Sequence, residues 1–276
     1  MHASHRPSRP AFSLIELLVV ISTIAVLLSF MLPTLSTMRQ TTYSAVCLAH
    51  QRAMGIGWHI YAADYDGLAM PLAYTEIEDV GSGDSIFWWG SVGNISGFID
   101  HSIGFLSPYL DSSLAEGTVY QCPSQPWGSY RPQGSPRTIT STYGYNGYYL
   151  TPAKTPGWAG QIGHRPWRRI SDVLQPTRLL VFADTLLSGD PPSNNALLDP
   201  PMIYRGRGRW RQNRAPTTAF RHARSSRGPG SVVAVRADGS ARLTQGQPEW
   251  IIDVDHAIGS LGTGNDPWYV PDWKDW

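Results

Sequence analysis

The feature of this sequence that most limits how the chain can fold is an apolar segment close to its N-terminus. Between Phe12 and Leu32 the only charged residue is Glu16. As an α-helix, the 22 residues from Ala11 to Leu32 are about 33 Å long, which matches the thickness of a bilayer hydrocarbon core, about 30 Å. The segment is therefore predicted to cross a membrane as a helix.

The carboxylate of Glu16 needs a partner or a specific role, because a charge in the centre of a membrane helix costs about 2.5–3.5 kcal/mol even on the insertion scales with the lowest penalties. Four basic residues precede the segment: His2, His5, Arg6 and Arg9. Positive charge tends to stay in the cytoplasm, so the remainder of the chain is predicted to lie outside it.

A secretory signal peptide is the ordinary alternative for such a segment. Its apolar core has 7–15 residues and is followed by a small-residue cleavage site. Here the segment is longer, contains Glu16 and is not followed by an A-x-A site. A plain, uncleaved signal anchor is the second alternative.

Residues 9–16, RPAFSLIE, followed by the apolar helix, resemble the leader and first mature residues of type IV prepilins and type II secretion pseudopilins. In that family the leader is cut before a Phe, and a Glu follows at the fifth mature position. The cut would fall between Ala11 and Phe12, which makes Glu16 the fifth residue. Pro33 becomes the twenty-second, where many members also have proline, and Ala11 stands where Gly is usual.

The resemblance implies that a prepilin peptidase removes residues 1–11 and that the new amine of Phe12 is N-methylated. It also implies that this amine pairs with Glu16 of a neighbouring subunit during assembly, since either charge alone is penalised in lipid. The implied partners are the peptidase, other pilin or pseudopilin subunits and the inner-membrane assembly platform. The implied location is the inner membrane, with a periplasmic or extracellular C-terminal domain.

The sequence after the membrane segment predicts an α+β, pilin-like fold. Residues 12–33 form the membrane or filament-core helix, 34–67 an amphipathic stalk that stops at the D-Y-D-G of residues 64–67, and 68–276 an exported, loop-rich β domain. The apolar positions expected to face the core are Leu35, Met38, Thr42, Ala45, Ala49, Ala53, Ile56 and Ile60. Gly55 and Gly57 suggest either close packing against a sheet or a helix end near Tyr61. The 27 Gly and 22 Pro indicate short strands between loops.

Short β-prone runs and proline-rich breaks alternate through the exported domain. The expected strands are Ser85–Trp89, Thr118–Gln121, Thr142–Leu150, Arg178–Ala183 and Ser231–Arg236, and the expected surface loops are Pro123–Pro136, Pro152–Pro166 and Pro191–Pro201. The clearest pairing signal is the turn Asp238-Gly239 between two β-prone arms, which predicts a hairpin.

The order of landmarks also resembles bacterial prepilin-like proteins with an H-x9-DG signature near the C-terminus. The blocks that carry this resemblance are Cys47 with residues 59–67, Tyr120–Ser124, Thr142–Asn146, Leu179–Asp184, Arg221-His222 and Asp238-Gly239. Fifteen residues separate His222 from Asp238 instead of nine, which suggests an inserted loop of about six residues.

No metal site, cofactor or catalytic residue is predicted. His222, Asp184 and Asp238 could be ligands or an acid/base set, but they are interpreted as hydrogen-bonded and turn residues. Asp64 and Asp66 resemble a calcium loop without its later ligands and are interpreted as a helix stop. Cys47 and Cys122 are the only cysteines, and an oxidising compartment would permit a disulfide between them.

The sequence contains no G-x-S-x-G, H-E-x-x-H or G-x-x-x-x-G-K motif, so the protein is not expected to be an enzyme. Between Asp199 and Asp238 there is no acidic residue, while arginines accumulate: Arg205, Arg207, Arg209, Arg211, Arg214, Arg221, Arg224 and Arg227. This run is interpreted as a solvated loop, with binding of DNA or an anionic glycan as the alternative. The 11 tryptophans are interpreted as core or subunit-contact residues, and stacking on sugars is their alternative role.

The leading hypothesis is therefore a structural subunit that assembles into, or primes, a type IV pilus or a type II secretion pseudopilus. The second is a filament-displayed or membrane-anchored binding module for DNA or anionic glycan. The third is a membrane-tethered enzyme that uses His222.

Overall fold

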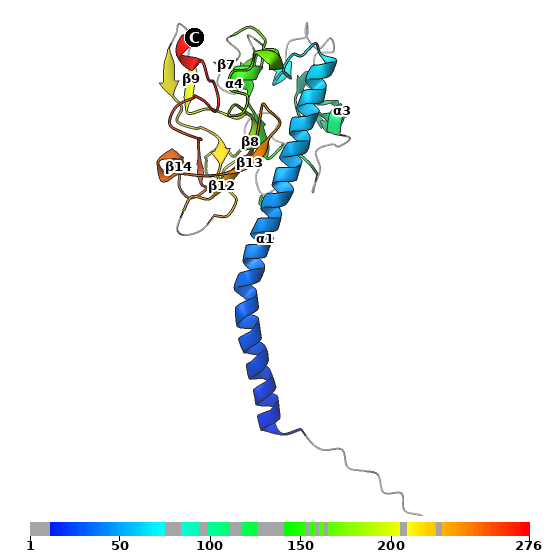
Figure 1. Ribbon diagram of the computed structural model, residues 1–276, viewed down its shortest axis with the longest axis vertical. Helices are drawn as coiled ribbons and strands as arrows, with labels where there is room; N and C mark the ends of the chain where they lie inside the picture. Colours follow the sequence, from blue (N-terminus) through cyan, green and yellow to red (C-terminus); the bar gives the residue numbers. More distant parts are fainter. Residues whose placement is uncertain are drawn as a thin grey trace, which may run out of the picture. The chain divides into compact units, whose positions relative to one another are not determined.

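The computed structural model describes residues 12–74, 84–93, 99–110, 118–125, 141–152, 155–157, 160–162, 165–204, 209–224 and 228–276. The chain divides into two compact units, Met1–Thr42 and Tyr43–Trp276, and the continuous helix α1 (Leu14–Asp64, 51 residues) runs through both (Figure 1). With the antiparallel sheets of the second unit, α1 gives an α+β fold, which confirms the predicted class.

In the first unit, α1 is apolar and exposed on all sides. Every side chain described from residue 12 to residue 42 is exposed, and α1 is long and apolar enough to cross a membrane. Its hydroxyl groups bond to carbonyls of the same helix, as Ser22 Oγ does to Leu18 O at 2.7 Å; the others are Thr23, Ser29, Thr34, Thr41 and Thr42. These bonds let polar residues sit in an apolar environment without leaving a donor unpaired.

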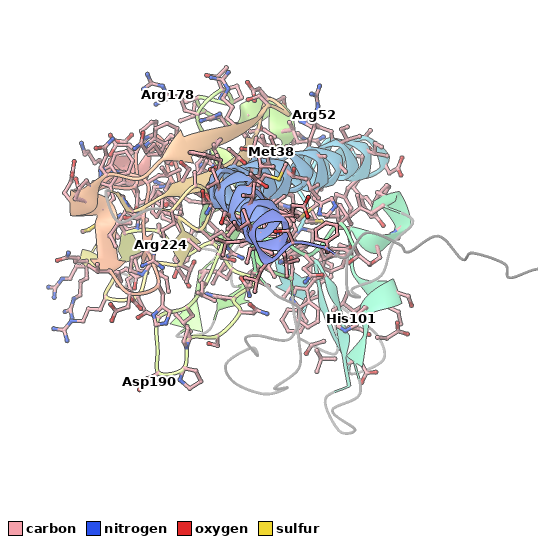
Figure 2. The ribbon with its side chains drawn as sticks, turned by 90° about the horizontal axis from the view of Figure 1, so that it is seen from below. Met38, Arg52, His101, Arg178, Asp190 and Arg224 are labelled. Carbon is pink, nitrogen blue, oxygen red and sulfur yellow. The ribbon has the colours of Figure 1, made fainter. Side chains whose placement is uncertain are left out.

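In the second unit, α1 buries a different face from the one predicted. Ile56 and Ile60 are 54% and 45% exposed, so the predicted stripe is wrong. The buried positions are Ser44, Cys47, Gln51, Met54, Trp58 and Tyr61, again at three- and four-residue steps. Hydropathy missed this face because part of it is polar: Gln51 Nε2 donates to Val233 O at 2.8 Å. On the exposed side, Arg52 points away from the domain (Figure 2).

The helix stops where the sequence predicted. Gly67 N–H donates to Ala62 O at 2.7 Å, and Asp66 and Gly67 have φ angles of +53° and +78°. A left-handed residue after the last turn ends a helix in this way. The interpretation of Asp66 as part of a helix stop is therefore confirmed.

The central sheet of the second unit is antiparallel, in the order β13-β12-β8-β5. Its strands are β5 (Tyr143–Tyr145), β8 (Leu180–Asp184), β12 (Ser231–Arg236) and β13 (Ala241–Gln245), and β8 and β12 are buried along their whole length. The turn at Asp238-Gly239 joins β12 to β13, with Gly239 at φ +81°, so the predicted hairpin is confirmed. The second half of α1 lies beside this sheet, as Figure 1 shows.

Gly55 explains how close α1 comes to the sheet. A Cβ atom on Gly55 would lie 2.7 Å from Cγ2 of Val235 on β12, closer than side chains normally approach. The prediction of close packing at this glycine is confirmed.

Smaller sheets surround the central one. One sheet contains β1 (Ala73–Tyr74), β2 (Ser85–Phe87), β3 (Gly90–Val92) and β4 (Ile99–Asp100). A second contains β11 (Thr218–Ala219), β15 (Ile258–Gly259) and β14 (Ile251–Asp253). Two further sheets have two strands each: β6 (Pro156–Gly157) with β7 (Gly160–Gln161), and β9 (Met202–Tyr204) with β10 (Trp210–Gln212). Short helical turns connect them: η1 (His101–Ile103), α3 (Ser107–Leu110), α4 (Gly147–Leu150), η2 (Ile170–Asp172), η3 (Pro248–Trp250) and η4 (Trp273–Asp275).

Three predictions for this domain need correction. Thr118–Gln121 forms a turn and no strand. The expected strand Thr142–Leu150 stops at Tyr145, because the Asn146 side chain donates to Leu180 O and Tyr269 O, both at 2.9 Å, and α4 follows. The segment Pro191–Pro201 is partly buried instead of lying wholly on the surface, with Ala196, Leu197 and Leu198 in the core. Most of Pro123–Pro136 and part of Pro152–Pro166 lie outside the described residues.

Candidate functional site

The N-terminal end of α1 carries the residues predicted for processing and assembly. Ala11 lies outside the described residues, and Phe12 is exposed. Ser13 N–H donates to Glu16 Oε2 at 2.9 Å, and Ile15 N–H donates to Ser13 Oγ at 3.3 Å. The two bonds form a capping box, in which a Ser and a Glu three positions later satisfy free N–H groups at a helix start. This local role of Glu16 is visible in the S-L-I-E spacing but was not predicted.

A second group of residues lies buried in the second unit, where four distant segments meet. Cys47 comes from α1, Cys122 from the turn before β5, Asp184 from the end of β8 and His222 from the segment after β11. Each offers one sulfur, nitrogen or oxygen atom, and these atoms all lie within 4.8 Å of one another. The four side chains, the Cys47/Cys122/Asp184/His222 cluster, are almost completely buried.

Direct contacts connect the members of the cluster. His222 Nε2 lies 3.2 Å from Asp184 Oδ2 and 3.4 Å from Cys122 Sγ, and Cys47 Sγ donates to Asp184 Oδ1 at 3.4 Å. Cys47 and Cys122, which are also hydrogen-bonded to each other, are both free thiols here. The structure thus brings together the two cysteines of the predicted disulfide, which stays a prediction.

Neighbouring groups hold the His222 ring and the Asp184 carboxylate in place. The other ring nitrogen of His222, Nδ1, lies 3.2 Å from Ser124 Oγ and 3.3 Å from Ser44 Oγ. Val233 N–H, on β12, donates to Asp184 Oδ2 at 2.8 Å. Each of these polar side chains therefore has a partner inside the domain, as burial requires.

The two cysteines have supports of their own. Cys122 N–H donates to Thr142 Oγ1 at 2.6 Å, and Tyr143 OH donates to Cys47 Sγ at 3.4 Å. Both supporting residues belong to the segment that enters β5. The sulfur positions are thus tied to the central sheet.

The pKa values in the cluster depend on burial, on the contacts among its four members and on Arg221. Burial works against the charge on Asp184, but the charge and hydrogen bond of His222, with Arg221, lower the pKa of Asp184. Burial also disfavours an imidazolium, yet the charge and hydrogen bond of Asp184 raise the pKa of His222 to about 10. Burial raises the pKa of Cys122, but hydrogen bonds from Cys47 and His222 outweigh it and lower that pKa to about 6. Burial, with the bond to Cys122, raises the pKa of the Cys47 thiol.

A pocket of about 260 Å³ lies next to the cluster. It is lined by Ser124, Arg221 and Gln125, together with Leu186, Ala219, Arg224, Asp255 and His256. Ser124 also contacts the His222 ring, so one wall of the pocket borders the cluster.

The structure separates the two ends of the H-x9-DG signature. His222 pairs with Ser231 at the beginning of β12, whereas Asp238 follows the end of this strand. Asp238 Oδ1 accepts a hydrogen bond from Ser240 N–H at 2.9 Å, which confirms its interpretation as a turn residue. His222 is hydrogen-bonded, as expected, but its cysteine partners were missed. The usable signal was that Cys47, Cys122, Asp184 and His222 each belong to a different one of the recognised sequence blocks.

The fold exposes some members of the arginine run and turns another inward, and it places several tryptophans in the core. Arg209, Arg211, Arg214 and Arg224 are exposed, and the last of these lies at the surface of the second unit (Figure 2), whereas Arg221 points inward. Trp58, Trp88 and Trp89 are in the core, as interpreted.

Comparisons of the chain with protein-family models, with curated proteins and with solved structures find no match.

Proposed function

We propose that this protein is a pilin-like structural subunit that a prepilin peptidase processes and that assembles into, or primes, a type IV pilus or type II secretion pseudopilus. The observation that carries the proposal is the apolar surface of α1, which is exposed on every side from Phe12 to Leu32. A helix that is apolar all round is stable only inside a membrane or among other apolar helices. A pilin passes through both environments.

The order of residues at the start of α1 supports the same proposal. The leader with its basic residues, Phe12 and Glu16 stand in prepilin order. The capping bond uses one oxygen of Glu16, and a carboxylate has lone pairs on two. Glu16 can therefore cap its own helix and still accept the Phe12 amine of a neighbouring subunit.

Mass spectrometry of the protein isolated from membranes tests this proposal. The expected mature chain begins at Phe12 and carries a methylated amine. Expression without a prepilin peptidase is the control and leaves the leader in place. An intact leader in the presence of an active peptidase, or a cut beyond Leu32, contradicts the proposal, and the first result would identify a plain signal anchor.

A binding module for DNA or anionic glycan is the second candidate. It is favoured by the exposed Arg209, Arg211 and Arg214, which lie on and beside β10 in a stretch without acidic residues. Retention of the protein on heparin or DNA should then fall steeply with salt, and an Arg209→Gln/Arg211→Gln/Arg214→Gln variant should elute earlier. Equal elution of the variant and the wild type contradicts this role.

A further inference from the structure

We propose that Cys47, Cys122, His222 and Asp184 form a binding site for a divalent metal ion, and that Zn²⁺ is the ion that suits them best. The proposal concerns a site away from the N-terminal helix and goes beyond the assembly function. The four donor atoms come from α1, the turn before β5, β8 and the segment after β11. A bound ion would join the helix to the central sheet.

The donor set is the first argument for zinc. Two sulfurs, one imidazole nitrogen and one carboxylate oxygen are all common Zn²⁺ ligands, and structural zinc sites usually have four. Thiolates exclude the ions that prefer oxygen, such as Mg²⁺ and Ca²⁺. Four buried protein ligands, one more than catalytic zinc sites usually have, favour a structural ion over a catalytic one.

The distances between donor atoms are the second argument. Usual zinc bond lengths in a tetrahedron place nitrogen and oxygen about 3.4 Å apart, nitrogen and sulfur about 3.5 Å, and oxygen and sulfur about 3.6 Å. Three contacts are close to these values: 3.4 Å for His222 Nε2 to Cys122 Sγ and, through different oxygens of the Asp184 carboxylate, 3.2 Å for His222 Nε2 to Oδ2 and 3.4 Å for Cys47 Sγ to Oδ1. All four donor atoms lie within 4.8 Å of one another, so the side chains need to close in by on the order of 1 Å, with one Asp184 oxygen turned toward the ion, to reach tetrahedral distances.

The surrounding hydrogen bonds are the third argument. Ser124 and Ser44 lie at Nδ1 of His222, so a proton on Nδ1 can be donated to a hydroxyl while the lone pair of Nε2 points into the cluster. Val233 N–H holds the Asp184 carboxylate. Such outer contacts orient metal ligands in known sites.

Charge balance is the fourth argument. Two thiolates and the Asp184 carboxylate carry three negative charges, which two charges of Zn²⁺ and one of the neighbouring Arg221 neutralise. Binding displaces the thiol protons and any proton on Nε2 of His222, and no electron is transferred. The pocket lined by Ser124 and Arg221 lies beside this site.

The test uses the full chain, purified in detergent under reducing conditions and without a histidine tag. We expect about one zinc ion per chain by mass spectrometry of metals, and cobalt replacement should give the visible bands of a tetrahedral ion with thiolate charge transfer. Cys47→Ser, Cys122→Ser and His222→Ala should lower the metal content at least about tenfold. His256→Ala removes the histidine of the His256–Asp253 pair, which contains no cysteine, and should keep the metal.

Measurements on the wild type remain decisive even where a variant fails to fold. Removal of the ion by a chelator should lower the Tm, and added Zn²⁺ should restore it. Failure of the reduced wild type to bind Zn²⁺, an octahedral cobalt spectrum, or equal metal loss in His256→Ala would overturn the proposal. So would a Cys47–Cys122 disulfide in the protein isolated from cells, because it removes both thiolates.

Discussion

His222 Nε2 lies 3.2 Å from Asp184 Oδ2, and both side chains are completely buried. One residue follows β11 and the other ends β8, so the contact connects two parts of the second unit. Cys47, on α1, donates to Asp184 Oδ1, so the same carboxylate also contacts the helix. The stability of the domain should therefore depend strongly on this carboxylate.

Asp184→Asn should lower the free energy of unfolding of the metal-free protein by about 3–5 kcal/mol, because it leaves His222 and Arg221 buried without their counter-charge. Urea unfolding followed by tryptophan fluorescence measures this change. Asp253→Asn is the matched control, since the His256–Asp253 pair is more exposed and should lose clearly less. Equal losses in the two variants would show that the buried His222–Asp184 contact stabilises the protein no more than the His256–Asp253 pair does.

Glu16 has two possible roles, which Glu16→Gln separates from Glu16→Ala. Glutamine can still form the capping bond to Ser13 N–H but has no charge for the Phe12 amine of a neighbour. If the pairing of charges drives assembly, both variants should be inserted and cleaved normally and both should fail to enter filaments. Immunoblots of sheared filaments and membranes measure this. Wild-type assembly of Glu16→Gln would leave capping as the only role of Glu16.

Gly55→Ala should destabilise the second unit, although alanine favours a helix by about 1 kcal/mol over glycine. The new Cβ would lie 2.7 Å from Val235 Cγ2, and overpacking of this kind costs about 1–3 kcal/mol. Val235→Ala removes the colliding methyl group, so the double variant should be more stable than the sum of the single losses predicts, by about 0.5 kcal/mol or more. Thermal unfolding of the four proteins measures the coupling. Strict additivity would mean that α1 shifts away from β12.

Asp199 should make the stability depend on pH. Burial raises its pKa to about 7, despite hydrogen bonds from Tyr148 and Asn195, whereas an unfolded Asp has a pKa near 3.9. Between these values the folded state binds more protons than the unfolded state. The contribution of Asp199 therefore falls as the pH rises from about 4 to 7, by at most about 1.4 kcal/mol per pH unit, and is constant above.

Asp199→Asn should flatten this part of the pH profile and stabilise the protein at pH values above about 7. Asp190→Asn, at an exposed position, serves as the control and should leave the profile unchanged. Unfolding in urea at a series of pH values gives the slope for each variant. An unchanged slope in Asp199→Asn would assign the pH dependence to other groups.

Elements with a strong local signal were predictable. The long helix, its stop at residues 64–67, and the hairpin at Asp238-Gly239 were all found from periodicity and turn residues. The strand expected at Thr142–Leu150 ends early because the Asn146 side chain bonds to two distant carbonyls, and no local pattern contains that information. The buried face of α1 was missed for a similar reason, since Gln51 is buried by its bond to Val233 O.

By itself, the sequence determined the apolar N-terminal helix, the α+β class and the residues available for chemistry, because these depend on composition and on contacts between near neighbours in the chain. Only the tertiary structure decided which face of α1 is buried and which residues meet there. Cys47 and His222 are brought into one cluster by the packing of α1 on the central sheet, across 175 positions of sequence. Spacing along the chain cannot encode such a meeting, since it depends on how distant segments pack and not on the residues between them.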